Sequence, residues 1–235
     1  MLEFAAVDVG SGSPLQCALC GGGSPAAYHP LSVITEQIRA SVDRWGAGPG
    51  PNVLLTGPEP FAHPELPAVV AACVEAGVER IGIETEGGAL SAPGNAAGVL
   101  AAGVTHLRIR MLSADEGPRA DRLYGRPGRP SAARVGIGAY REAAEREGVL
   151  VAIVGVVPVC RHNVETLPAT VGHLAAWGVH AIRLDVVPEM SATAGAFVTA
   201  ACDTGMVNQL WVEAGGVQLP PSHALHCTEE GIRRE

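Results

Sequence analysis

Two cysteines three positions apart, Cys17 and Cys20, lie in the glycine-rich segment GSGSPLQCALCGGGS of residues 10–24. A pair with this spacing can supply half of a zinc site, a redox-active dithiol, or two ligands of an iron–sulfur cluster. Ser13 lies four residues before Cys17, where a third ligand would stand. Its hydroxyl is a harder and far less acidic donor than a thiol, and hence a poor replacement for a thiolate on iron. The pair alone leaves all three chemistries open.

Short apolar runs alternate with longer helical patterns along the chain. The predicted strands are residues 4–9, 52–57, 80–85, 106–112, 150–157 and 181–187. Helices are predicted near residues 31–45, 64–76, 92–102, 132–147 and 164–177. This alternation predicts six β/α units, and right-handed crossovers then give a parallel sheet covered by helices. An open doubly wound sheet and a curved partial barrel both satisfy the pattern.

The residues with chemical potential follow the strands at their carboxyl ends, where both architectures collect functional groups. The cysteine segment follows the first strand, GPEP (57–60) the second, ETEGG (84–88) the third and PVCRHN (158–163) the fifth. A polar stretch rich in Arg, Gly and Pro, residues 116–131, is predicted to be a lid or substrate loop. Residues from 205 onward fit no unit clearly, although QLWVEAGGVQLP is consistent with a short strand pair across an open sheet edge.

The charge pattern gives no reason to expect nucleic acid or a membrane as a partner. The net charge is −8, and all sixteen basic residues are arginines without a block of like charge. No apolar run approaches the roughly 18 residues of a membrane span, and the amino terminus does not resemble a secretory signal. Six cysteines scattered over 235 residues do not resemble the disulfide framework of a small secreted domain. We therefore expect a cytoplasmic protein with reduced thiols.

Taken together, these motifs resemble those of the radical S-adenosylmethionine (SAM) superfamily, over roughly residues 3–190. That family has a C-x-x-x-C-x-x-C loop directly after its first strand, and SPLQCALC has this spacing, with serine at the first cysteine position. GPEP resembles the family's G-G-E-P segment, which cradles the amino group of SAM, although Pro58 departs from it and removes a backbone donor. ETEGG resembles the family's ETNG, and LYGRPG resembles a loop of its peptide-modifying members.

The resemblance implies an α/β fold, specifically a partial (β/α)6 TIM-like barrel, over residues 1–204, with 205–235 as a carboxy-terminal extension. It implies a 4Fe-4S cluster and SAM as cofactors, from which a 5′-deoxyadenosyl radical is generated to modify a small-molecule or peptide substrate. An electron-donor protein is an implied partner. The implied cluster ligand positions are Ser13, Cys17 and Cys20. The implied cofactor contacts are Gly57, Pro58, Glu59, Pro60, Glu84, Thr85, Arg110 and Val156.

Several alternatives remain open from the sequence. Ser13 is compatible with a natural member that has lost the chemistry, with one that uses another ligand, or with an introduced inactivating change. Cys160 is a secondary candidate for a substrate-facing thiol or replacement ligand, and the cluster SHALHC (222–227) for a metal site. Cys73 and Cys202 are predicted to be core residues. The rival functions are a non-catalytic protein that binds a substrate or partner, and a SAM-binding enzyme without radical chemistry.

Overall fold

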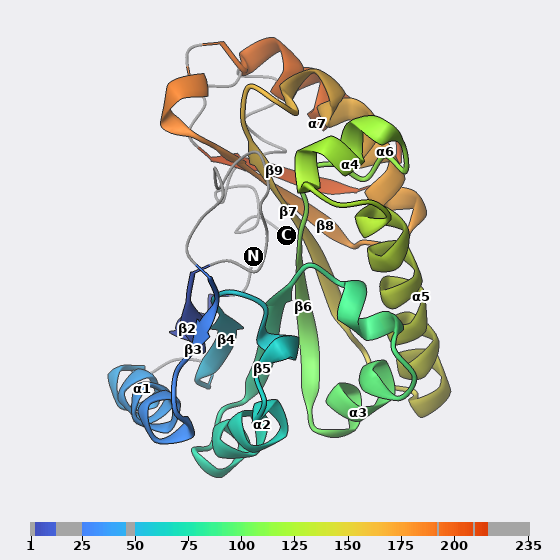
Figure 1. The fold of residues 1–235 in the computed structure, drawn as a ribbon. Helices are drawn as coiled ribbons and strands as arrows, with labels where there is room; N and C mark the ends of the chain where they lie inside the picture. The colour runs from blue at the N-terminus through green and yellow to red at the C-terminus, as the bar shows by residue number, and fades with distance from the viewer. Residues whose placement is uncertain (1–2, 13–24, 46–49, 192, 209, 216–235) are drawn as a thin grey trace.

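The computed structural model describes residues 3–12, 25–45, 50–191, 193–208 and 210–215. Seven parallel strands form one sheet in the order β1-β4-β5-β6-β7-β8-β9. They are β1 (Ala5–Asp8), β4 (Asn52–Thr56), β5 (Arg80–Thr85), β6 (Val104–Arg110), β7 (Ala152–Val159), β8 (Ala181–Val186) and β9 (Trp211–Gly215). The strand order follows the chain order, so each new strand adds to the same side of the last. This gives a curved open sheet, with β1 and β9 at its two edges (Figure 1).

Helices cover the convex face of this sheet (Figure 1). They are α1 (Leu31–Arg44), α2 (Leu66–Glu75), α3 (Asn95–Ala101), α4 (Pro118–Tyr124), α5 (Arg129–Glu147), α6 (Leu167–Ala176) and α7 (Gly195–Val207). Short 3-10 turns follow several strands: η1 (Pro60–Ala62), η2 (Gly88–Ser91), η3 (Val164–Thr166) and η4 (Pro188–Met190). None of the helices in these described ranges is long and apolar enough to cross a membrane.

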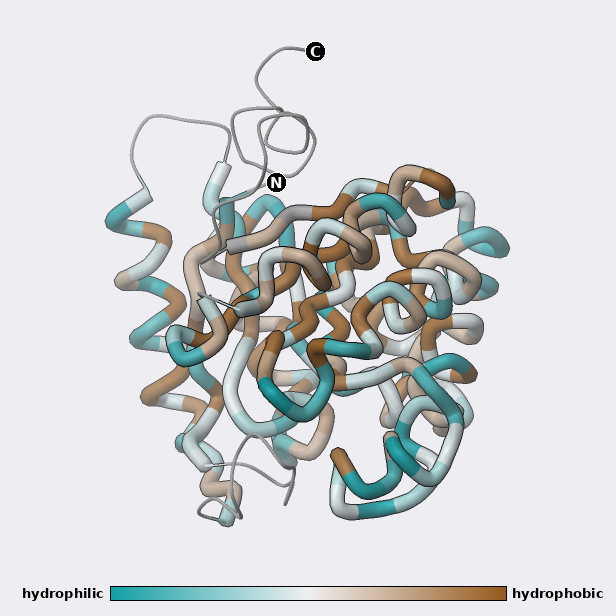
Figure 2. Tube along the Cα trace, turned by 90° about the horizontal axis from the view of Figure 1, so that it is seen from above, coloured by the Kyte–Doolittle hydropathy of each residue, from teal (hydrophilic) through white to brown (hydrophobic). Residues whose placement is uncertain are grey.

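The main core lies between the helices and the convex face of the sheet. Alternate strand residues such as Val7, Leu55, Ile83 and Ile109 are buried there, because side chains along a strand point to opposite faces. In Figure 2 apolar stretches run through the middle of the molecule, and hydrophilic ones lie mainly at its periphery. Cys73 and Cys202 belong to this core, as the sequence predicted, and burial raises the pKa of the Cys73 thiol to about 12. The concave face of the sheet carries the other set of alternate strand side chains, among them Arg110 and Val156.

A small antiparallel pair, β2 (Gly10–Ser11) and β3 (Ala27–Tyr28), closes the base of the loop that leaves β1. Ser11 lies opposite Ala27 in its register, and the His29 N–H donates to Val9 O at 2.9 Å. Both ends of the segment between Ser11 and Ala27 are therefore fixed at the carboxyl end of β1. Ser13, Cys17 and Cys20 themselves lie outside the described residues, as do His223, His226 and Cys227.

The predicted strands and the five predicted helices are present, with ends that differ by a few residues. Helix α7 was not predicted, and it packs against α6 before the chain enters β9. Residues 211–215 of QLWVEAGGVQLP form β9 as an added parallel strand beside β8. The rest of the predicted strand pair, residues 216–220, lies outside the described part of the chain. The β/α alternation predicted a parallel sheet covered by helices and left two architectures open, and the observed fold is the α/β partial barrel that the family resemblance implied.

Candidate functional site

The GPEP turn after β4 lies against the base of the cysteine segment. Gly57 has a φ of +116°, a backbone conformation that side-chain-bearing residues rarely adopt. A Cβ built on Gly57 would lie 3.2 Å from the carbonyl oxygen and 3.3 Å from the nitrogen of Gly10. The Tyr28 hydroxyl donates to Glu59 O at 3.1 Å. The two segments that the sequence placed after neighbouring strands therefore touch at the carboxyl edge of the sheet.

The Glu59 carboxylate connects this turn to the end of β5. Its Oε1 accepts hydrogen bonds from Thr85 Oγ1 at 2.8 Å and from the Phe61 N–H at 3.2 Å, and its Oε2 accepts from the Glu86 N–H at 2.9 Å. Burial raises the pKa of Glu59, while these hydrogen bonds and the charges of Arg129 and Arg110 oppose that rise. Glu59 therefore acts within the structure as a brace between two strand ends, and Thr85 is its partner. Pro60 follows as the buried first residue of η1.

The Arg110 guanidinium at the end of β6 collects three acceptors from two other strand ends. Nη1 donates to Glu84 Oε1 at 3.2 Å, and Nη2 lies 3.4 Å from Gly57 O and 3.3 Å from Pro58 O. The Arg110 side chain is 38% exposed and that of Glu84 is 18% exposed, so the group is open to a ligand. Two backbone carbonyls and a carboxylate converge here on one cation. We call Gly57, Pro58, Glu84 and Arg110 the Arg110 hub.

Val156 lies beside the Arg110 hub on the concave face. It is directly opposite Arg110 in the β6–β7 register and opposite Arg183 in the β7–β8 register. Arg183 Nε donates to Asp185 Oδ1 at 2.6 Å, and both side chains are 42% exposed. The cross-strand row thus carries two partly exposed ion pairs separated by an apolar side chain. The second pair, Arg183 and Asp185, was not singled out from the sequence.

A buried ion pair joins the end of β5 to the start of α5. The Glu86 carboxylate contacts the Arg129 guanidinium, and Arg126 Nη2 lies 3.9 Å from Glu86 Oε2. The Glu86 and Arg129 side chains are only 6% and 13% exposed. This pair fixes the LYGRPG segment beside Glu59, and the Gly128 N–H is held by Asp121 Oδ1 at 3.0 Å. Both motifs were noted in the sequence, yet the pairing of Glu86 with Arg129 across 43 positions was not predicted.

Two polar side chains fix the loops that follow β6 and β7. The Tyr124 hydroxyl accepts from the Leu112 and Ser113 N–H groups and donates to Ser113 O. Asn163, fully buried, donates from Nδ2 to Leu112 O and Pro158 O, and its Oδ1 accepts from the Cys160 N–H. Cys160 is itself buried. Residues 116–131, predicted to be a lid or substrate loop, contain helix α4 and the start of α5, and Tyr124 anchors α4 to the loop after β6.

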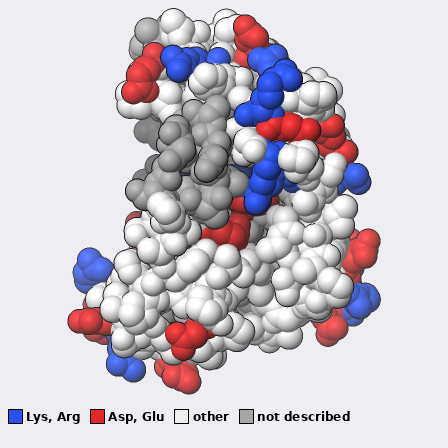
Figure 3. Space-filling model, in the orientation of Figure 1, with Lys and Arg blue, Asp and Glu red and all other residues white. Residues whose placement is uncertain are grey.

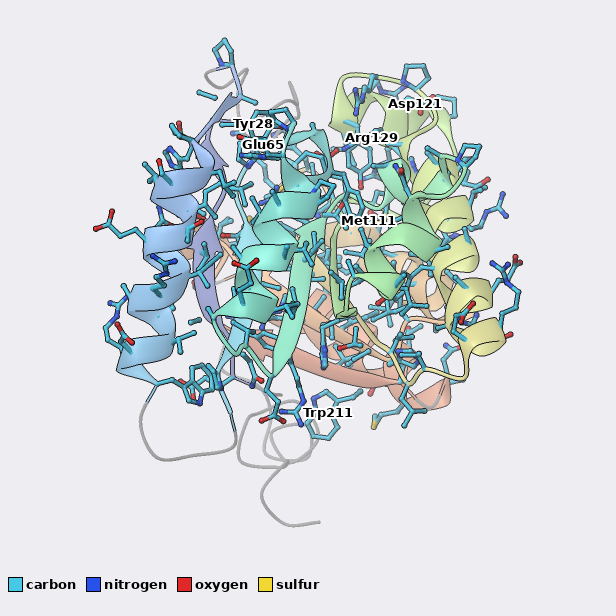
Figure 4. All side chains as sticks on the ribbon, turned by 90° about the horizontal axis from the view of Figure 1, so that it is seen from below. Tyr28, Glu65, Met111, Asp121, Arg129 and Trp211 are labelled. Atoms are coloured by element: carbon cyan, nitrogen blue, oxygen red, sulfur yellow. The ribbon has the colours of Figure 1, made fainter. Side chains whose placement is uncertain are left out.

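The functional side chains gather at one end of the strands. Figure 4 shows Tyr28, Arg129 and Asp121 at the carboxyl end of the sheet and Trp211 at the opposite end. In Figure 3 acidic side chains lie in the hollow at the centre of the face shown, next to basic ones. Among the residues the structure describes, no group of three His, Cys, Asp or Glu side chains could hold a metal ion.

The Arg110 hub has the donors and acceptors that an α-amino acid group requires. Carbonyl oxygens and a carboxylate attract an ammonium group, and a guanidinium pairs with a carboxylate in two parallel hydrogen bonds. Gly57 keeps the nearby backbone free of a side chain. Of the cofactor contacts that the resemblance implied, the structure brings Gly57, Pro58, Glu84, Arg110 and Val156 together at the carboxyl ends of β4, β5, β6 and β7. Glu59, Pro60 and Thr85 are buried next to these residues, and the hydrogen bond between Glu59 and Thr85 joins the two strand ends.

No family model and no curated protein matches this chain. Solved structures do match it. They include SuiB of Streptococcus suis bound to S-adenosylmethionine (12% identity, TM-score 0.54, covering 77% of this chain and 40% of SuiB). SuiB bound to the precursor peptide SuiA matches with 14% identity, a TM-score of 0.56 and coverage of 83% and 42%. The radical S-adenosylmethionine methyltransferase TsrM of Kitasatospora setae matches with 11% identity, a TM-score of 0.50 and coverage of 78% and 36%.

This chain spans less than half the length of each of these solved proteins. At such low identity, the likeness concerns the fold. The fold match covers 77% to 83% of this chain, and the parallel sheet of the described residues agrees with the predicted β/α architecture, with β9 as a strand beyond the six predicted ones. The chain therefore has the α/β partial barrel fold of the radical SAM type.

Proposed function

We propose that this chain is the SAM-binding barrel of a radical SAM enzyme that modifies a small molecule or a peptide. The observation that carries the proposal is the Arg110 hub, where the carbonyls of Gly57 and Pro58 and the carboxylate of Glu84 converge on one guanidinium. It lies beside the base of the CxxC segment, through the approach of Gly57 to Gly10. Both features occur at the carboxyl edge of a barrel of the radical SAM type, and this supports the assignment.

The residues of the hub hold the cofactor in the proposed arrangement. The Gly57 and Pro58 carbonyls accept hydrogen bonds from the ammonium group, in place of the Arg110 donor that occupies them in this structure. Arg110 then pairs with the carboxylate while Glu84 keeps the guanidinium oriented. Val156 forms the apolar wall next to them, and Glu59 with Thr85 keeps the strand ends at a fixed separation. When bound to a reduced 4Fe-4S cluster, SAM supplies one-electron chemistry at unactivated carbon atoms.

The cluster ligand positions in this proposal are Ser13, Cys17 and Cys20, and an electron-donor protein reduces the cluster. A small-molecule or peptide substrate is supported by the ligands of the matched proteins, since SuiB was solved with a precursor peptide and TsrM with tryptophan. The partly exposed pair of Arg183 and Asp185 gives the concave face a charged group of each sign, which suits a polar substrate backbone or a zwitterion.

Ser13 supports a second candidate, a SAM- or substrate-binding protein of the same fold without radical chemistry. With two thiolates in place of three, a cluster loses a ligand that an oxygen donor replaces poorly. Anaerobic reconstitution with iron and sulfide separates the candidates. In the radical enzyme, the protein or its Ser13→Cys variant holds about four irons per chain and releases 5′-deoxyadenosine with SAM and a reductant. Absence of iron from both forms contradicts the radical assignment.

The hub itself is tested by binding rather than by turnover. Calorimetry compares SAM with decarboxylated SAM, which keeps the ammonium group and lacks the carboxylate. Arg110→Gln is expected to weaken SAM binding about tenfold or more, the loss of a charged hydrogen-bonded pair, and to affect the decarboxylated compound much less. Arg44→Gln, at the exposed carboxy-terminal end of helix α1, is the matched control and leaves both affinities unchanged. Equal losses for both compounds would contradict the assigned role of Arg110.

A further inference from the structure

The His63 side chain is buried between the turn that follows β4 and the arm by which the cysteine segment returns to the barrel. His63 is 4% exposed. Its Nε2 lies 3.0 Å from His29 O, and its Nδ1 lies 3.0 Å from the Glu65 nitrogen. The Tyr28 ring packs edge to face against it, with the ring centroids 5.4 Å apart, and Figure 4 shows Tyr28 and Glu65 at the same end of the sheet. The His63 ring thus bridges the turn and residues 27–29, which we call the returning arm.

These contacts determine which ring nitrogen of His63 carries the proton. A backbone N–H only donates, so Nδ1, which faces the Glu65 N–H, carries the lone pair. A carbonyl oxygen only accepts, so Nε2 carries the proton and donates a hydrogen bond to His29 O. Both ring nitrogens are therefore used by backbone groups. This arrangement makes His63 a link between two segments rather than a metal ligand or a proton-transfer group.

The returning arm also contacts the outgoing end of the cysteine segment. A Cβ on Gly10 would collide with Ala27 O, so glycine at this position lets the two backbones meet. The His29 N–H donates to Val9 O at 2.9 Å, which ties the returning arm to the end of β1. The His29 carbonyl accepts from His63. Both polar backbone groups of His29 are thus hydrogen-bonded, one to the sheet and the other to the turn after β4.

We propose that His63 is a positioning residue for metal binding by Cys17 and Cys20, acting through its hydrogen bond to His29 O. The inference rests on the proposed function, in which these cysteines hold a cluster. A segment whose two ends are already fixed loses less conformational freedom when two of its side chains come together on one ion. The bond from His63 fixes one of these ends, so its loss raises that cost. The other bond of the ring, from the Glu65 N–H, holds the turn before α2 and not the cysteine segment.

Two amide substitutions separate the two hydrogen bonds of the ring. In His63→Gln the side-chain amide reaches the place of Nε2 and keeps a donor for His29 O. In His63→Asn the shorter amide reaches only the place of Nδ1 and keeps an acceptor for the Glu65 N–H. Each variant loses the ring and one hydrogen bond, so a merely structural role of His63 would affect both alike. His173→Asn, at an exposed position of α6, is the control for the change of residue type.

The probe is Co²⁺, titrated into the full chain under anaerobic reducing conditions, because thiolate ligation gives Co²⁺ an absorption band of its own. A variant with serine at both Cys17 and Cys20 shows whether the band comes from this pair. We expect His63→Asn to weaken Co²⁺ binding about tenfold or more. His63→Gln and His173→Asn should bind Co²⁺ nearly as tightly as the unmodified chain. Hydrogen exchange gives a second readout, since the His29 amide should exchange faster in His63→Asn alone.

Three results would overturn the proposal: no thiolate band when Co²⁺ is added to the unmodified chain, unchanged Co²⁺ affinity in His63→Asn, or equal losses in His63→Asn and His63→Gln. If circular dichroism shows that His63→Asn does not fold, Tyr28→Phe takes its place. It removes only the hydroxyl that holds the same arm to Glu59 O, and it should then weaken Co²⁺ binding. An unchanged affinity in Tyr28→Phe would in that case reject the role of the returning arm.

SAM titration and reconstitution with iron and sulfide keep this proposal apart from the proposed function. Unchanged Co²⁺ affinity in His63→Asn, together with a cluster and SAM binding in the parent chain or its Ser13→Cys variant, rejects the role of His63 alone. The expected loss of Co²⁺ affinity, without a cluster or SAM binding in either form, supports the role of His63 and rejects the radical SAM assignment.

Discussion

Thr85 Oγ1 donates a hydrogen bond of 2.8 Å to Glu59 Oε1, and this contact joins the turn after β4 to the end of β5. The same hydroxyl accepts from the Gly87 N–H at 3.1 Å. Both strand ends thus depend on one buried side chain, which is 1% exposed. The carbonyls of Gly57 and Pro58, which contact Arg110, precede Glu59 directly in the sequence. The hydrogen bond between Thr85 and Glu59 therefore helps to fix the position of these two carbonyls, although Thr85 itself is buried.

Thr85→Val is predicted to lower the free energy of unfolding by about 1–3 kcal/mol, because valine keeps the shape and leaves buried polar groups without a partner. Urea denaturation at pH 7 measures the change. Thr193→Val, at an exposed position, serves as the control and should have almost no effect. An equal free energy for Thr85→Val and the unmodified chain would show that the brace is unimportant for stability.

Gly57→Ala is predicted to destabilise the protein more than Gly77→Ala. Both glycines have positive φ, at +116° and +78°, and an alanine at either is strained by about 1–3 kcal/mol. Only at Gly57 does the new Cβ also meet backbone, 3.2 Å from Gly10 O, whereas nothing lies within 4 Å at Gly77. Thermal melts of the two variants, compared side by side, measure the difference. A larger loss for Gly77→Ala would contradict the close approach.

Asn163→Leu is predicted to cost about 2–4 kcal/mol of unfolding free energy, since it leaves the Leu112 and Pro158 carbonyls and the Cys160 N–H without their buried partner. Asn208→Leu, at the exposed end of α7, is the control for the change of residue type. Hydrogen exchange should show faster exchange of the Cys160 amide in Asn163→Leu. Unchanged exchange there would mean that the loop after β7 is held in another way.

Acid is predicted to destabilise the protein partly through His180. Its Nδ1 accepts the Ile153 N–H at 2.9 Å, and burial, together with the charge of Arg141, lowers its pKa below the usual value of 6.5. The unfolded chain therefore binds the proton first, so this contribution is complete above about pH 6.5 and is lost as the pH falls through the unfolded and then the folded pKa.

His180→Asn keeps an acceptor near the Ile153 N–H and removes the titration. Urea denaturation between pH 7.5 and pH 5 should therefore show a shallower loss of stability in this variant than in the unmodified chain. The slope does not vanish, because the pKa of His106 is lowered in the same direction. Identical slopes in the two proteins would reject the assignment to His180.

The sequence alone determined the order of elements and the end of the sheet at which the functional residues gather. Continuous apolar strands and helices ending in glycine and valine are local patterns, and β/α alternation then permits few topologies. It therefore predicted β1 and β4 to β8, and it placed GPEP and ETEGG at neighbouring strand ends. Helix α7 was not predicted because its sequence, GAFVTAACDTGMV, is rich in glycine and β-branched residues, which have low helix propensity. Packing against α6 stabilises this helix despite its low intrinsic propensity.

Only the tertiary structure decided which side chains meet. Arg110 reaches the carbonyl of Gly57 across 53 positions, and Glu86 pairs with Arg129 across 43. No local pattern encodes such distances, because they depend on the curvature of the sheet and on side-chain directions at each strand end. The contact of His63 with His29 across 34 positions has the same cause. The periodicity of apolar residues determines where helices and strands form, whereas the sites depend on contacts between elements that are far apart in the sequence.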